Sequence, residues 1–80
     1  MARYFFNLSE CGTLLRDEEG RDVSDAGQLH QLAVREARQL MAAEIEDGHL
    51  CLSCRIEVLD AEQRPVLILP FREAVAVTGL

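Results

Sequence analysis

The chain has 80 residues, of which 49% are hydrophobic and 28% charged, proportions typical of a folded globular protein rather than a disordered one. This length predicts a single small domain spanning residues 1–80. The formal net charge of −6 repels a phosphate backbone, so nucleic acid is an unfavourable partner.

The cellular compartment is predicted from the apolar runs and the cysteines. No run approaches the roughly 20 apolar residues of a membrane span, and the apolar run near the start is too short for a signal peptide. Three cysteines are an odd number and too few for a disulfide scaffold. We therefore expect a cytoplasmic protein with reduced thiols that does not enter a membrane.

The first third of the chain predicts a β-hairpin. Residues 3–8 are rich in aromatic side chains, which suit the pleated surface of a strand. Residues 9–12 have the composition of a turn, and residues 13–16 are predicted to return as the second arm. Residues 17–20 then form a polar loop that ends in a glycine able to adopt a positive φ.

The middle of the chain predicts an amphipathic helix from Ser24 or Asp25, either of which can cap it, to about Asp47, with Gly48 ending it. Six apolar residues fall within one stripe at 100° per residue: Ala26, Leu29, Ala33, Ala37, Leu40 and Met41. Polar residues occupy the other side: Gln28, Gln31, Arg35, Arg38, Gln39 and Glu46.

The last third of the chain predicts a second hairpin. Residues 54–59 alternate between apolar and polar side chains, as in a strand with one solvated face. Residues 60–64 form a turn, and residues 65–71 form a strand that is apolar on both faces, with Pro65 and Pro70 expected at its ends or on an edge. Residues 71–77 fit either a helical turn or an extension of this strand.

The predicted fold class is therefore α+β with the order ββαββ. Two β-hairpins form an antiparallel or mixed four-stranded sheet, and one helix packs on one of its faces. Residues 3–8 and 65–71 are the most apolar strands, so we expect them in the centre of the sheet and the other two strands at its edges.

A second interaction surface follows from this arrangement, because one helix covers only one face of a sheet. Phe5, Val66 and Ile68 are apolar on the face that the helix leaves bare, and an exposed apolar patch usually marks an interaction site. We expect a second copy of the chain to cover this face, giving a homodimer. The alternative is that residues 71–80 fold back over it.

The cysteines and a histidine are the candidate metal ligands. Cys11, His49, Cys51 and Cys54 would make a Cys₃His set of the kind that binds structural zinc. However, residues three apart on a strand point to opposite faces and lie about 10 Å apart, too far for a chelate or a disulfide. The expectation is therefore no metal and no cofactor. A small zinc or thiol-redox protein that uses His49, Cys51 and Cys54 remains an alternative.

The sequence contains no recognisable catalytic constellation, so we expect a non-enzymatic interaction module of unknown function and no catalytic residues. Arg35 and Arg38 on the polar side of the helix suggest an alternative, a regulatory protein that binds nucleic acid or an acidic partner. A solvated face balanced by Glu36 and Glu46 explains these arginines equally well.

Five segments in a fixed order form a pattern that covers nearly the whole chain. They are Arg3-Tyr4-Phe5-Phe6, Asp17-Glu18-Glu19-Gly20, a helix with Ala33 and Ala37, Ile56-Glu57-Val58 before Asp60, and Pro70-Phe71-Arg72. This pattern resembles the DUF6894 family of small proteins frequent in alphaproteobacteria. The resemblance implies a single domain in a bacterial cytoplasm, and it implies no enzymatic activity or other function. Cys54 stands where the pattern has glycine or a small residue, and the turn at 61–63 lacks its usual glycine, so no family-wide metal role is implied.

Overall fold

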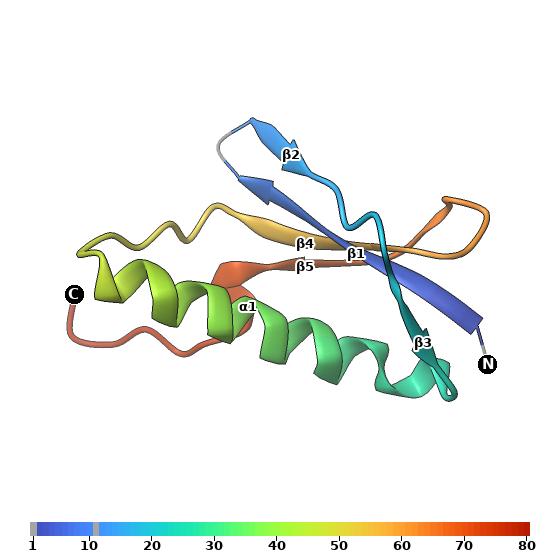
Figure 1. The fold of residues 1–80 in the computed structure, drawn as a ribbon. Coiled ribbons are helices and arrows are strands. Elements are labelled where there is room, and N and C mark those ends of the chain that lie inside the picture. The colour runs from blue at the N-terminus through green and yellow to red at the C-terminus, as the bar shows by residue number, and fades with distance from the viewer. Residues whose placement is uncertain (1, 11) are drawn as a thin grey trace.

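A computed structural model of the protein describes residues 2–10 and 12–80. Within these residues, one long helix packs against one face of a five-stranded antiparallel sheet, which is an α+β fold (Figure 1). The elements are β1 (Ala2–Glu10), β2 (Thr13–Leu15), β3 (Arg21–Val23), a 3₁₀ turn (Ala26–Gln28), α1 (Leu29–Glu46), β4 (Arg55–Leu59), β5 (Pro65–Pro70) and a second 3₁₀ turn (Phe71–Glu73).

The strands follow the order β2-β1-β4-β5, and β3 pairs with the first half of β1. Leu8 lies opposite Ile56, which in turn lies opposite Leu69. The prediction of four strands missed β3. This segment has only three residues, two of them charged, so it shows no strand periodicity and is extended because it pairs with Ala2–Tyr4.

The prediction that residues 65–71 form a central strand is wrong, because β5 lies at the edge and β4 takes the central position. Apolar side chains on both faces of a strand favour a position buried on both faces, which β5 does not have. Leu69 is buried, but Val66 and Ile68 are exposed. The edge position agrees with the prediction for the prolines, since Pro65 and Pro70 stand at the ends of this strand and outer strands tolerate missing amide donors.

The helix follows its prediction closely. Asp25 caps the preceding 3₁₀ turn, where its side chain accepts a hydrogen bond from the Gly27 amide at 2.9 Å. Gly48 ends the helix with a φ of 80°. Ala33 and Ala37 are fully buried, and their small side chains let α1 approach β4 and β5 closely.

The core lies between α1 and the sheet, and its largest buried side chains are Phe71, Ile56 and Leu69. After Phe71 the chain runs back along α1 (Figure 1), where the Arg38 Nε donates to the Ala74 carbonyl at 2.7 Å. The alternative in which residues 71–80 cover the bare face of the sheet is therefore wrong.

An aspartate fixes the turn between β4 and β5. One carboxylate oxygen of Asp60 accepts hydrogen bonds from the amides of Glu62 and Arg64, each at 2.9 Å. Gln63 has a φ of 65°, the left-handed conformation that costs roughly 1–2 kcal/mol for a residue with a Cβ. Glycine is the side chain that this position favours.

We therefore expect Gln63→Gly to raise the free energy of unfolding by up to about 1 kcal/mol, because glycine adopts this φ without a steric penalty. Urea denaturation measures the change. Ala61→Gly, in the same turn but without a positive φ, is the matched control and should give no gain. An equal response of the two variants would contradict the assignment of strain to Gln63.

Candidate functional site

The sheet surface opposite α1, here called the outer face, is the candidate site. It carries Phe5 and Asn7 on β1, Arg55, Glu57 and Leu59 on β4, and Ile68 on β5. These residues alternate along their strands with side chains that pack in the core. The Arg55 Nε and a Glu57 carboxylate oxygen lie 3.0 Å apart, so the centre of the face has no unpaired charge.

Asp17 joins the outer face to the edge of β1. β1 pairs with β3 through residues 2–4 and with β2 through residues 8–10, which leaves the amide of Phe6 between the two partners. The Asp17 Oδ2 accepts a hydrogen bond from this amide at 3.1 Å, and its Oδ1 accepts one from the Gly20 amide at 3.0 Å. The amide of Asp17 itself donates to the Oδ1 of the buried Asn7 at 2.8 Å.

These contacts set the protonation of Asp17. Burial raises the pKa of its carboxyl, but backbone hydrogen bonds from Gly20, Phe6 and Glu19 together outweigh burial and hold the pKa below the ordinary value. A carboxyl whose pKa is lower in the folded state stabilises the fold fully above the unfolded pKa of about 4. This contribution is lost as the pH falls through the lower, folded pKa.

We expect Asp17→Asn to reduce the free energy of unfolding by about 1–3 kcal/mol, because the amide has only one oxygen for two backbone donors. Its stability should also fall less steeply than that of the wild type between neutral pH and about pH 3. Denaturant titrations across this range test both effects. Glu18→Gln, at the exposed neighbour, should behave like the wild type, and an unchanged acid response in Asp17→Asn would contradict the assignment.

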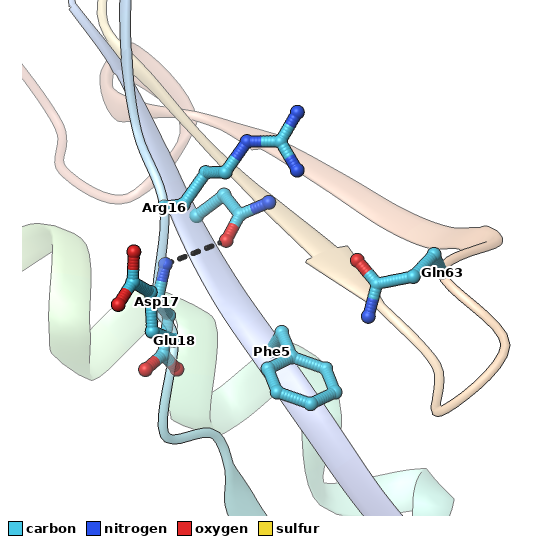
Figure 2. Close-up of a pocket in the computed structure, with 6 residues that line it drawn as sticks. Phe5, Arg16, Asp17, Glu18 and Gln63 are labelled. Atoms are coloured by element: carbon cyan, nitrogen blue, oxygen red, sulfur yellow. Dashed lines mark hydrogen bonds between the residues drawn. The ribbon is translucent and has the colours of Figure 1, made fainter.

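A hollow of about 380 Å³ lies on this side of the outer face, and Figure 2 shows Phe5 between the Asp17 segment and Gln63. Its lining residues are Phe5, Asn7, Arg16, Asp17, Glu18 and Gln63. Because the Asp17 carboxylate already accepts two backbone hydrogen bonds, it is poorly suited to act as a general base. The hollow combines one aromatic side, one exposed arginine and amide groups.

Gly20 allows the loop to pass close to β1. Its φ is 70°, and a Cβ at this position would lie 2.9 Å from both the Phe5 ring and the Tyr4 carbonyl oxygen. The side of Phe5 that faces the loop is therefore covered, and Phe5 is only partly exposed.

We expect Gly20→Ala to destabilise the protein by roughly 2 kcal/mol or more, because the unfavourable φ and the steric overlap add together. Gly12→Ala is the matched control: its φ is 82°, but a Cβ there would meet nothing within 4 Å. Thermal unfolding of both variants separates the two contributions. Equal losses would show that the close approach to β1 has no energetic weight.

The three residues predicted for the apolar patch are only partly brought together. Val66 and Ile68 are neighbours on β5, with 47% and 54% of their surface exposed. Phe5 lies on β1, with β4 between it and β5, and it contributes to the hollow instead. The exposed apolar part of the predicted interaction face is thus concentrated on the edge strand.

Arg35 and Arg38 lie on the exposed side of α1, as predicted. They line a hollow of about 460 Å³ together with His30, Gln31, Val34 and Glu73. Arg38 is held by its hydrogen bond to the Ala74 carbonyl, and Glu73 adds a negative charge beside it. The binding of an acidic partner by these arginines stays a prediction.

The expected separation of Cys51 and Cys54 is wrong. β4 begins at Arg55, and the chain bends across residues 52–53, so both cysteines are buried in the same core. Burial raises the pKa of the Cys54 thiol to about 12, and a hydrogen bond with the Cys51 side chain adds to this effect. So little thiolate exists at neutral pH that thiol exchange at Cys54 is strongly disfavoured.

The remaining candidate ligands are placed differently. The His49 Nδ1 lies 3.2 Å from a carboxylate oxygen of Glu44, with most of the imidazole exposed. Cys11 lies outside the described residues. Across residues 2–10 and 12–80, no group of three or more His, Cys, Asp or Glu side chains is arranged to hold a metal ion.

The comparisons with known proteins identify the family. Residues 3–72 match the family model described as "Domain of unknown function (DUF6894)", and the chain belongs to this family. No curated protein and no solved structure matches it. In the part of the chain that the structure describes, no helix is both long enough and apolar enough to cross a bilayer.

Proposed function

We propose that the protein is a small non-enzymatic interaction module that acts as a homodimer through the outer face. One observation carries this proposal: Ile68 lies on the outer face with 54% of its surface exposed, between Leu67 and Leu69, which pack in the core, and Val66 on the same strand is 47% exposed. Adjacent exposed aliphatic side chains on a regular element favour association, because association removes them from water.

The arrangement of charge around this patch supports the same proposal. β5 itself carries no charged residue, and the nearest charges on β4 are those of Arg55 and Glu57, which pair with each other. Two copies can therefore bring these strands together without opposing like charges, although each carries a net charge of −6. Added salt screens the overall repulsion and should favour the dimer.

Two further parts of the proposal concern chemistry and location. The non-enzymatic assignment is supported by the Asp17 carboxylate, which the backbone engages, and by the protonated, buried Cys54 thiol. The proposed location is the bacterial cytoplasm, where the reducing environment suits buried thiols in a protein without a disulfide scaffold.

The oligomeric state tests the proposal. We expect sedimentation equilibrium of the wild type to show a dimer, and Ile68→Lys to weaken it by at least about tenfold, because a buried ammonium loses its hydration. Ile45→Lys is the matched control, since Ile45 is 60% exposed but lies on α1, away from the outer face. A wild-type mass of one chain from micromolar to millimolar concentration would overturn the proposal.

A further inference from the structure

The free edge of β5 is the longest unpaired strand edge in the described part of the chain. β5 has six residues and pairs on one side only, with β4. Outer strands of soluble proteins are usually protected by charged side chains, extreme shortness or bulges. β2 and β3, the other strands with a free edge, have three residues each. β5 has no charge, and its protection is confined to its ends, with a proline at each end and a bulge at the Pro65 end.

The hydrogen-bond pattern shows which amides face this free edge. The Phe71 amide donates to the Cys54 carbonyl at 2.9 Å, so Phe71 directs its backbone groups toward the β4 side. In an antiparallel ladder this direction alternates from one residue to the next. Leu69 and Leu67 therefore bond to β4, whereas Ile68 directs its N–H and C=O groups outward; the alternation holds as far as Leu67, because the bulge follows at Val66. Pro70 also falls on the outward side, where its missing N–H costs no bond to β4.

We infer that β5 pairs antiparallel with β5 of a second copy across a twofold axis, so that the two sheets become one continuous sheet. This inference rests on the proposed homodimer and specifies its interface. The axis is perpendicular to the sheet, which places both helices on one side and both outer faces on the other. The Ile68 side chains of the two copies then lie beside each other, and the outward Ile68 amide of each copy finds an acceptor on the other strand.

Three features favour a second copy over a different partner. A twofold axis requires antiparallel pairing, and a short strand without charges is compatible with itself in that orientation. The pairing satisfies the outward Ile68 amide and brings the exposed Ile68 side chains of the two copies into lateral contact at the same time. The bulge at the Pro65 end limits pairing to the half of β5 nearer Pro70, which limits addition of further strands and favours a closed dimer.

Amide hydrogen exchange followed by NMR, on the whole protein over a range of concentrations, tests the edge pairing. At concentrations where the dimer forms, the Ile68 amide should exchange about tenfold or more slowly than in the diluted monomer, because its hydrogen bond to the second copy must open before exchange. The amides of Leu67 and Leu69 bond to β4 in either state and serve as internal controls, so their protection should not depend on concentration.

The outcomes separate the two proposals. A dimer in which the Ile68 amide gains concentration-dependent protection while the Leu67 amide does not supports edge pairing. A dimer whose Ile68 amide still exchanges rapidly would overturn edge pairing and leave a face-to-face homodimer. A chain that remains monomeric at millimolar concentration would overturn both.

Discussion

The carboxylate of Asp17 closes the one break in the outer edge of β1, and the rest of the sheet depends on this closure. β1 has two short partners on that edge, and the Phe6 amide falls between them. An unpaired buried amide is costly. β1 can therefore change its pairing partner from β2 to β3 only where another acceptor binds the amide between them. Asp17 supplies that acceptor and, through Gly20, directs the chain toward the start of α1.

The same solution recurs at other changes of direction. Asp25 accepts from the backbone before α1, and Asp60 accepts from two amides in the turn between β4 and β5. Short carboxylates suit this role because they reach amides two to four residues away without leaving their own turn. Part of the strongly acidic composition is therefore explained by the architecture, without any acid-binding partner.

Features set by local patterns could be predicted from the sequence, whereas features set by distant pairing could not. The helix was predictable because Asp25, Gly48 and the buried alanines are a continuous local signal. The edge position of β5 was not, because apolar residues on both faces of a strand do not reveal whether the second face is covered. The role of Asp17 was equally hidden: an aspartate three residues before a glycine indicates a turn, but its bond to Phe6 depends on the path of the whole chain.

The strand order also bears on how a newly synthesised chain acquires its structure. The long inner edge of β1 pairs with Arg55–Leu59, so Phe6 faces Val58 from the far end of the sequence. Until that segment leaves the ribosome, β1 can pair only with the two short strands on its other side. Contacts between distant segments form slowly, and unpaired strands are the surfaces on which nascent chains aggregate. The interval before Arg55–Leu59 is synthesised is therefore the stage at which a chaperone that covers β1 would be of most use to this protein.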